Sequence, residues 1–220
     1  KFKDGSIQII DYGRGIPVDF NTKENRYNWE LVYCELYAGG KYNNISGENY
    51  EYSLGLNGLG ACATQYASEY FDVEVTRDGH KYYLHFEKGV NIGGLKKEET
   101  RFRKTGTKQK WKPDREVFQD TNISDGYFVK ILKQQAIVNA GIKFVFQKEE
   151  DNSEEIFYYP EGVLGYVREL NGTVGFSEPV MFESSGKGRD RSDKPEYKLK
   201  FSVAFAFNNY VNNLEYFHNS

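Results

Sequence analysis

The alternation of apolar and polar positions predicts a chain rich in β-strands. Apolar residues alternate on both sides of Asp78-Gly79 in FDVEVTRDGHKYYLHFEKG, which predicts a β-hairpin because a D-G pair favours a tight turn. The same period of two, or a short apolar run, marks four further strands. They are expected in SIQII near the start, around TGTKQKWKPD, in IKFVFQ and in YKLKFSVAFAF.

Four other segments have the spacing of helices. NWELVYCELYA, residues 28–38, begins with Asn28, a candidate N-cap. ACATQYASEYF places small residues where a helix could pack closely on a sheet. YFVKILKQQAIVNAG is expected to end at Gly141, and YYPEGVLGYVREL predicts a short helix. The apolar residues expected on one face of the third helix are Phe128, Ile131, Leu132 and Ile137.

Polar segments separate these elements. Residues 39–54 predict a surface loop of the kind that acts as a lid, residues 148–155 an exposed acidic turn, and residues 184–196 a flexible charged loop. Together, the order of elements predicts an α+β fold in which helices lie on one face of a mostly antiparallel sheet.

Composition places the chain among globular proteins. Of its 220 residues, 28 % are charged, and the formal net charge is −3, so no basic surface for nucleic acid is indicated. Cys34 and Cys62 are far apart in sequence and are expected to be reduced core thiols. No apolar run approaches the ~20 residues that span a bilayer, which favours a cytoplasmic protein without a membrane partner.

The first segment with candidate chemistry is IIDYGRGIPV. Asp11 stands at the end of a predicted strand, where its carboxylate could accept a hydrogen bond from the exocyclic amine of adenine. Gly13 and Gly15 would leave room for a flat base. Taken alone, D-x-G-x-G is weakly specific, since an ordinary Asp-Gly turn has the same sequence.

The second segment is GLNGLG, residues 55–60, which directly precedes a predicted helix. It lacks the strand before it and the later acidic residue of a dinucleotide-binding fold, and it lacks the G-K-S/T ending of a Walker loop. What remains is a glycine-rich approach to a helix N-terminus, where backbone amides and the helix dipole favour an anion.

The combination of motifs is more specific than any one of them. With DYGRGIP, AGGK at 38–41, GLNGLGA and KTGT at 104–107, the sequence resembles the ATPase subunits of bacterial type IIA topoisomerases, DNA gyrase B and its topoisomerase IV counterpart. The resemblance continues through WKPDREVF, KILKQQAIVNAGIKFVF and YPEGVLGYVREL. It implies a GHKL ATP-binding α/β sandwich at 1–155 and part of a ribosomal-S5-like transducer domain at 156–220.

The resemblance also implies a set of ATP-binding residues. Asp11 would bind the adenine amine directly and through a water, and Thr107 would place a hydroxyl near the base. Arg14 would lie at the pocket mouth, or would be a solvated surface arginine, and Arg77 matches an arginine that coumarin-type inhibitors touch. The complete set is Asp11, Gly13, Arg14, Gly15, Ile16, Pro17, Gly39, Gly40, Lys41, Tyr50, Leu56, Asn57, Gly58, Leu59, Gly60 and Thr107.

Within this set, Gly39, Gly40 and Lys41 would begin the lid, Tyr50 would reach the nucleotide from it, and 56–60 would wrap the β- and γ-phosphates. The sequence departs from the family pattern at three positions. Asn57 replaces a usual His, Leu54 a usual Gly, and Tyr12 a usual Asp or Asn. Asn57 can still donate to a phosphate but cannot share a proton.

The resemblance implies ATP and Mg²⁺ as cofactors. The family's general-base Glu, its Mg²⁺-holding Asn and its γ-phosphate lysine are expected outside these residues, so no catalytic residue is assigned and slow hydrolysis is expected. DNA, an A-type subunit, a second copy of the chain and coumarin-type inhibitors are the implied partners. The alternative is a non-catalytic nucleotide-binding module of a divergent gyrase B paralogue, and gyrase is not distinguished from topoisomerase IV.

Overall fold

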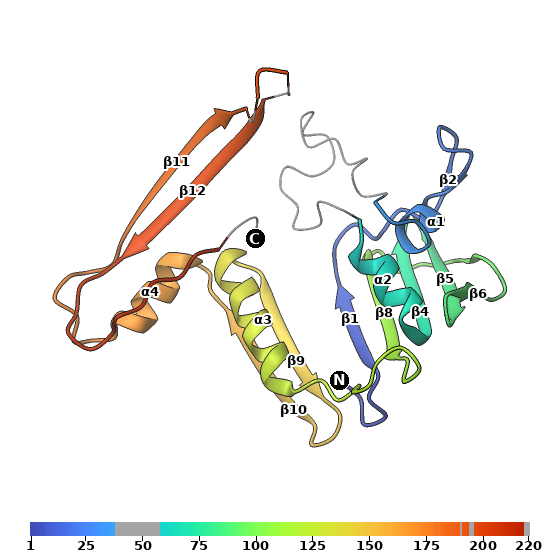
Figure 1. Ribbon diagram of the computed structural model, residues 1–220, viewed down its shortest axis with the longest axis horizontal. Coiled ribbons are helices and arrows are strands. Elements are labelled where there is room, and N and C mark those ends of the chain that lie inside the picture. Colours follow the sequence, from blue (N-terminus) through green and yellow to red (C-terminus); the bar gives the residue numbers. More distant parts are fainter. Residues whose placement is uncertain (38–57, 190, 194–195, 218–220) are drawn as a thin grey trace. The chain divides into compact units, whose positions relative to one another are not determined.

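A computed structural model describes residues 1–37, 58–189, 191–193 and 196–217 of the chain (Figure 1). The chain divides into two compact units. In its described part, the first unit comprises residues 1–37, 58–123 and 148–153, and the second comprises 124–147 together with the described residues of 154–217.

A six-stranded sheet forms the frame of the first unit. Its strand order is β1-β8-β4-β5-β6, with β7 also paired to β5, and each of these pairs is antiparallel. The strands are β1 (Ile7–Asp11), β4 (Ser68–Arg77), β5 (His80–Glu87), β6 (Val90–Asn91), β7 (Lys96–Glu99) and β8 (Gly106–Pro113).

The hairpin predicted around Asp78-Gly79 is confirmed as β4 and β5, which pair from Tyr70↔Glu87 to Arg77↔His80. Asp78 and Gly79 have φ angles of 51° and 73°, the left-handed values that a two-residue turn of this kind requires. Strands predicted at SIQII and around TGTKQKWKPD are confirmed as β1 and β8. Four short strands have no counterpart among the predicted elements: β2 (Phe20–Asn21), β3 (Arg26–Tyr27), β6 and β7.

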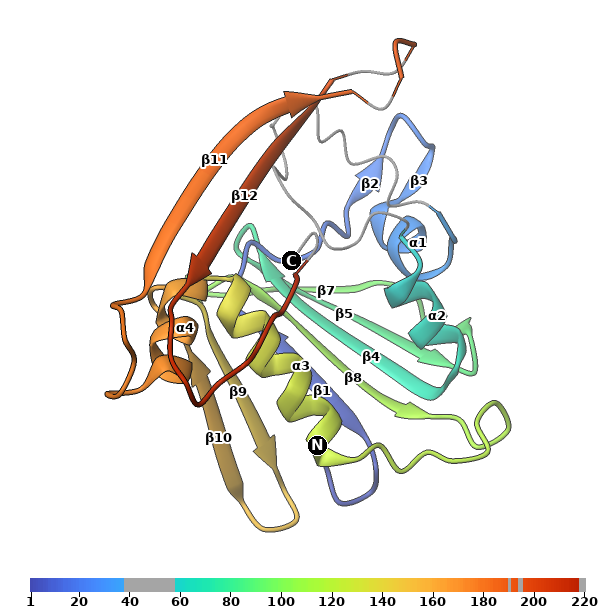
Figure 2. The ribbon, with the colours of Figure 1, turned by 60° about the vertical axis from the view of Figure 1, so that its left-hand side comes forward.

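Two short helices lie over one face of this sheet, α1 (Asn28–Tyr33) and α2 (Gly60–Tyr66) (Figure 2). The sequence predicts both, but both are shorter than expected. The N-cap of α1 is Tyr27 rather than Asn28, and Glu30 accepts a hydrogen bond from the Tyr27 amide at 2.8 Å. The segment after α2 pairs with β8 from Ser68 onward, so strand hydrogen bonding replaces the last part of the predicted helix.

The core of the first unit lies between the helices and the sheet. Aromatic rings from α1, β4 and β5 meet there: Tyr33 lies 5.6 Å from Phe71 and 6.0 Å from Phe86 between ring centroids. Such pairs stabilise a core beyond the area they bury. The buried cluster consists of Val18, Trp29, Tyr33, Phe71, Val73, Val75, Tyr82, Leu84 and Phe86.

The two thiols belong to the same unit and are both free. Cys62 is buried within α2, and Cys34 is half-buried at the end of α1. Burial, followed by the neighbouring Cys62 and Glu30, raises the pKa of Cys34 to about 11. A thiol of this kind holds little thiolate near neutral pH, as expected of an unreactive structural cysteine.

The second unit contains α3 (Asp125–Val138) and α4 (Val163–Asn171), together with the hairpin of β11 (Val180–Gly188) and β12 (Tyr197–Phe205). It also contains the hairpin of β9 (Lys143–Lys148) and β10 (Ser153–Tyr158), except for residues 148–153 at its turn, which belong to the first unit. The sequence predicts both helices, although α3 ends at Val138 rather than at Gly141. Of the four residues expected on its packed face, Ile137 is buried, but Ile131 is 37 % exposed. Phe128 stacks on Phe146 of β9 at 5.5 Å.

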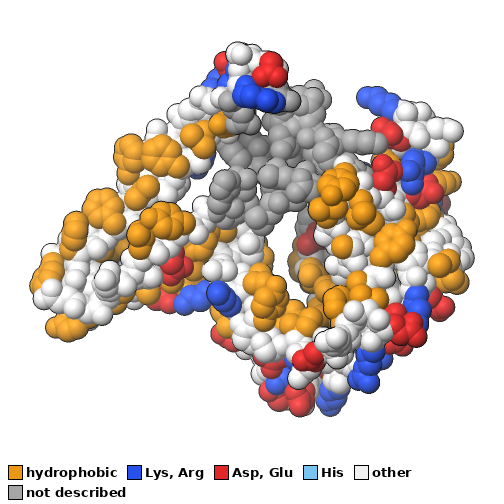
Figure 3. Space-filling model, in the orientation of Figure 1, with side chains coloured by type: hydrophobic (Ala, Val, Ile, Leu, Met, Phe, Trp, Pro, Cys, Tyr) orange, Lys and Arg blue, Asp and Glu red, His pale blue; other side chains and the backbone are white. Residues whose placement is uncertain are grey.

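The β11–β12 hairpin corrects the expectation of a flexible loop over the whole of 184–196. Residues Ser184 to Gly188 continue β11 and pair with Tyr197 to Phe201, because the alternating pattern of β12 extends opposite them. Apolar side chains are exposed along this hairpin (Figure 3). Seven of them share one face by register: Val180, Phe182, Tyr197, Leu199, Phe201, Val203 and Phe205.

None of the helices in the described part of the chain has the length and apolar character needed to cross a membrane.

Candidate functional site

The candidate site begins where β1 ends. Asp11 pairs with Thr107 of β8, and Thr107 pairs with Val75 of β4, so the three residues form one row across the sheet. Four residues back along β1, Ile7 pairs with Trp111 next to the core, and an even offset along a strand keeps a side chain on the same face. The Asp11 carboxylate is therefore at the rim of the helix-bearing face, where it remains exposed.

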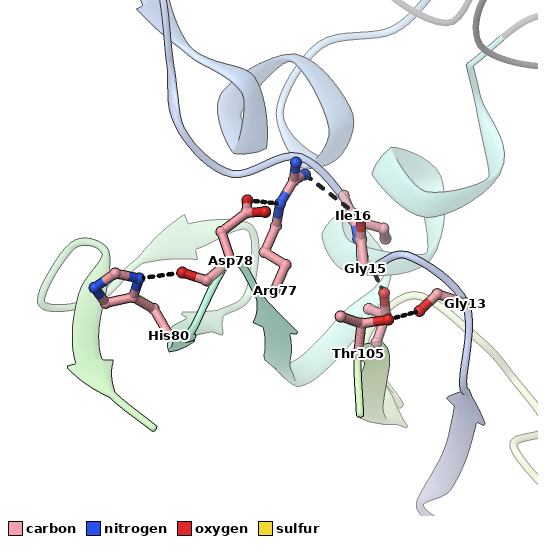
Figure 4. Close-up of polar contacts among 8 residues, drawn as sticks. Gly13, Gly15, Ile16, Arg77, Asp78, His80 and Thr105 are labelled. Atoms are coloured by element: carbon pink, nitrogen blue, oxygen red, sulfur yellow. Dashed lines mark hydrogen bonds and ion pairs between the residues drawn. The ribbon is translucent and has the colours of Figure 1, made fainter. Parts of the chain in front are cut away.

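Hydrogen bonds from β8 hold the loop that follows Asp11. The Thr105 hydroxyl donates to the Gly13 carbonyl at 2.6 Å (Figure 4). The Ile16 amide donates to the Thr107 hydroxyl oxygen at 3.1 Å. Thr107 is 4 % exposed, so its hydroxyl satisfies a partly buried amide. Within the loop, the Gly13 amide donates to Asp11 Oδ1 at 2.8 Å.

Gly15 is the position where the loop comes closest to β4. Its φ is +80°, and an added Cβ would lie 3.0 Å from both the Thr76 carbonyl oxygen and Val75 Cγ1. A side chain would therefore be excluded both by the backbone conformation and by the available space. The sequence analysis expects Gly15 to leave room for a flat base, and the close approach of the loop to β4 is a separate reason for glycine at this position.

Arg77 holds the same loop from the end of β4. Its Nη1 donates to the Gly15 carbonyl at 3.5 Å, and its Nε pairs with Asp78 Oδ2 at 2.8 Å (Figure 4). His80 Nδ1 lies 2.8 Å from the Asp78 carbonyl oxygen on the other side of the turn. In the structure, Arg77 is thus a loop-supporting residue as well as a candidate ligand contact.

The remaining residues of the predicted pocket floor lie beside this loop. Ile16 packs against the buried core cluster, Pro17 is half-buried, and Arg14 is exposed. Hydrogen bonds and strand pairing therefore join Asp11, Gly13, Gly15, Ile16 and Thr107 into one structural group.

The predicted phosphate-binding segment is described only in part. Gly58 has a φ of +60°, Leu59 is the N-cap of α2, and Gly60 is the first helical residue. Ala61 packs against the core cluster, which places α2 on the same face of the sheet as Asp11. Six predicted site residues lie outside the described residues: Gly39, Gly40, Lys41, Tyr50, Leu56 and Asn57.

The opposite face of the sheet carries charges instead of a core. Asp72 lies in register between Lys110 and His85, and its Oδ1 is 2.6 Å from His85 Nδ1. Hydrogen bonding to Asp72 raises the pKa of His85 above its usual value, and Glu87 adds to this effect against the opposing effect of burial. Asp72, His85 and Lys110 border a hollow of about 430 Å³ on this face, away from the Asp11 loop.

Sequence reasoning misses the roles of Thr105 and Asp78 at the site. A signal for Thr105 is present: KTGT places two hydroxyls two residues apart, which puts both on one side of an extended segment. The sequence assigns Asp78 only to the turn, and its pairing with Arg77 depends on a side-chain conformation that no pattern encodes. Within the described ranges, no group of three or more His, Cys, Asp or Glu residues is arranged to hold a metal ion.

No protein-family model matches the chain, but many individual proteins do. The topoisomerase 4 B subunit of Salmonella typhimurium is 36 % identical over 171 residues, which cover 77 % of this chain and 27 % of that protein. The DNA gyrase B subunit of Mycoplasma pneumoniae is 33 % identical over 216 residues, covering 96 % of this chain and 33 % of that protein. The chain thus spans about a third or less of the length of these relatives.

Solved structures agree with these sequence matches. The 43K ATPase domain of Thermus thermophilus gyrase B, solved with an aminocoumarin, matches with a TM-score of 0.66 and 29 % identity over 83 % of this chain and 45 % of that chain. The topoisomerase IV ATP-binding domain of Francisella tularensis, at 24 % identity and a TM-score of 0.60, covers 73 % of this chain and 74 % of that chain and supports the fold alone. The predicted α+β fold of GHKL type is confirmed. The transducer domain stays a prediction.

Proposed function

We propose that this chain, which over its matched region belongs to the family of gyrase B and topoisomerase IV B proteins, is the ATP-binding module of such a protein. The observation that carries the proposal is the row of Asp11 and Thr107 at the edge of the core, with a glycine loop fastened above it. A carboxylate and a hydroxyl in register can recognise the edge of a base that carries an exocyclic amine.

In this proposal, Asp11 selects adenine. Oδ1 is already held by the Gly13 amide, so Oδ2 is the oxygen that would accept the amine of the base. The Thr107 hydroxyl oxygen accepts the Ile16 amide, so its proton can be donated towards the base or a bridging water. Gly15, Ile16 and Pro17 would form the floor beneath the base, and Arg14 would stand at the mouth.

The phosphates would be bound by Gly58, Leu59 and Gly60 at the start of α2, with Leu56, Asn57 and the predicted lid residues. Mg²⁺ would accompany the nucleotide, and in the described segments no three or more His, Cys, Asp or Glu residues are grouped to hold it. No step is therefore assigned to a metal held by these residues. Slow ATP hydrolysis by this chain alone stays a prediction, which a turnover measurement would check.

The role in the whole protein is a wider proposal. ATP binding would close the predicted lid and favour pairing with a second copy, and this change would be coupled to DNA passage with an A-type subunit. Residues 156–220 would belong to a transducer domain that passes the change on. The division at 155 stays a prediction.

The proposal is tested by binding to wild type, Asp11→Asn and Asp19→Asn. Asp19 is an exposed carboxylate in the same loop region, so its replacement makes the same charge change away from the Asp11–Thr107 row. We expect Asp11→Asn to weaken binding of a non-hydrolysable ATP analogue roughly 10- to 100-fold, because a hydrogen bond to a charged group is lost. Asp19→Asn should bind as wild type does.

Thermal shift with the ATP analogue and with an aminocoumarin gives an independent measurement, since a ligand that binds only the folded state raises Tm. A shift that is lost in Asp11→Asn and kept in Asp19→Asn supports the pocket. The absence of any shift in wild type, with both ligands, would contradict the proposed function.

A further inference from the structure

The Thr105 hydroxyl makes one of the hydrogen bonds that hold the loop after Asp11, and this bond is exposed to solvent. Thr105 precedes β8 and is exposed, yet its hydroxyl donates to the Gly13 carbonyl at 2.6 Å. We propose that Thr105 is a positioning residue for Asp11, acting through Gly13 on the orientation of the carboxylate that would select adenine. This inference rests on the proposed function.

Gly13 connects Thr105 to Asp11, because its carbonyl accepts from Thr105 and its amide donates to Asp11. The carbonyl of Gly13 belongs to the peptide after that glycine and its amide to the peptide before it. The two peptides meet at the Gly13 Cα, so a carbonyl held by Thr105 leaves the amide fewer orientations than a free one would. That amide donates to Asp11 Oδ1 at 2.8 Å. The carboxylate is thereby turned so that Oδ1 faces the loop and Oδ2 is presented to a ligand.

Gly13 is suited to this part because of its closeness to the carboxylate. A Cβ at position 13 would lie 3.0 Å from Asp11 Oδ1, tighter than ordinary van der Waals contact. The short approach therefore depends on glycine, and the direction of its amide depends on what holds its carbonyl. Thr105 provides that second constraint.

The two threonines of KTGT hold different parts of the loop after Asp11. Thr107 is buried and accepts the Ile16 amide, which anchors the second half of the loop to the core. Thr105 anchors the first half, where the carboxylate lies. The loop also rests on Arg77 through Gly15, so loss of the Thr105 hydroxyl leaves the second half fastened.

If Thr105 only stabilised the fold, loss of its hydroxyl would lower stability without a specific effect on the contact between Asp11 and the base. The bond is solvent-exposed, so water can replace the threonine hydroxyl at the Gly13 carbonyl, and the free energy of unfolding should change little. A positioning role instead predicts a loss confined to the contact between Asp11 and the amine of the base.

The test uses Thr105→Val, which keeps the branched shape and removes the hydroxyl, and Thr105→Ser, which keeps the hydroxyl. Binding is measured for a non-hydrolysable ATP analogue and for the same nucleotide with hydrogen in place of the 6-amino group. We expect Thr105→Val to weaken binding of the amino nucleotide by about 3- to 10-fold, the value of a neutral hydrogen bond. Binding of the nucleotide without the amine should stay the same, and Thr105→Ser should behave as wild type.

A ligand-free measurement tests the first link. Hydrogen exchange of the Gly13 amide should be faster in Thr105→Val than in wild type, and unchanged in Thr105→Ser, because a carbonyl held by the Thr105 hydroxyl would favour the bond from this amide to Asp11.

Equal weakening of both nucleotides by Thr105→Val, or none, overturns the inference while leaving the proposed function in place. Unchanged exchange at Gly13 overturns it as well. Wild type that binds neither nucleotide would overturn the proposed function and this inference together, so the two failures are distinguishable.

Discussion

Successive residues of each strand in the six-stranded sheet point to opposite faces, and one face is apolar and buried while the other is charged. On the helix-bearing face, Phe71, Val73 and Val75 of β4 are buried under α1 and α2. On the other face, the intervening residues Asp72 and Glu74 pair with His85 and with two lysines, and all of these side chains are partly or well exposed. Burial of apolar area is the dominant stabilising contribution, whereas exposed ion pairs contribute little, so stability should depend almost wholly on the first face.

The candidate site lies at the edge of the sheet, where the buried core gives way to solvent. We call this region the margin. Asp11 lies on the core face but beyond the helices, so its row passes from a buried valine through a buried hydroxyl to an exposed carboxylate. A polar group in this position is held by a rigid frame and can still meet a ligand. Distinct responses to substitution are therefore expected at the core, at the margin and on the charged face.

The largest effect is expected at the core. Phe86 is fully buried, with ring centroids 6.1 Å from Trp29 and 6.4 Å from Phe71, and Phe86→Ala should lower the free energy of unfolding by about 3–5 kcal/mol. Tyr83→Ala removes an aromatic ring from the other face of the same strand, where it is half-buried, and should cost about 1 kcal/mol. Urea denaturation measures both. Similar losses would mean that the two faces contribute equally.

An intermediate effect is expected at the margin. Gly15→Ala forces a Cβ against Thr76 and Val75 at a φ of +80°, while Gly79→Ala places one in open space at a φ of +73°. The backbone cost of about 1–2 kcal/mol is common to both, and crowding adds about 1–3 kcal/mol at Gly15 alone. The difference between the two variants in urea denaturation isolates the close approach of the loop to β4. If Gly79→Ala costs as much, crowding is not the reason for glycine at position 15.

Much of the first unit follows from the sequence, for a physical reason. The hairpin around Asp78-Gly79 and the strands of β1 and β8 are set by alternation and turn chemistry, which are local. The end of α2 is not, because the residue pattern favours more helix while pairing of Ser68 onward with β8 decides the outcome. Short strands such as β2 and β7 have too few residues to show a period.

The candidate site divides in the same way. Asp11 and Thr107 can be named from motifs, and their register can be expected once both are placed on neighbouring strands. The bond from Thr105 to Gly13 cannot, because it joins residues far apart in sequence through a backbone carbonyl that no side-chain pattern reveals. The exposed face of β11–β12 shows a related limit: alternation predicts which residues of β12 share a face, but not that β11 pairs with it.

The smallest effect is expected on the charged face, as a pH dependence. His85 has a raised pKa, first through its hydrogen bond to Asp72 and then through Glu87, so the folded state holds the proton more tightly than the unfolded chain. This contribution to stability is complete below the unfolded value of about 6.5 and is lost as pH rises through the higher folded pKa. Both side chains are well exposed, which limits the effect to about 0.2–1 kcal/mol.

The stability difference between wild type and His85→Gln, from urea denaturation, should therefore be larger in mildly acidic than in mildly alkaline buffer. In an Asp72→Asn background, the same replacement should show a smaller pH dependence. A difference that grows as pH rises would contradict the assignment and would place a repulsive charge, rather than Asp72, in control of His85.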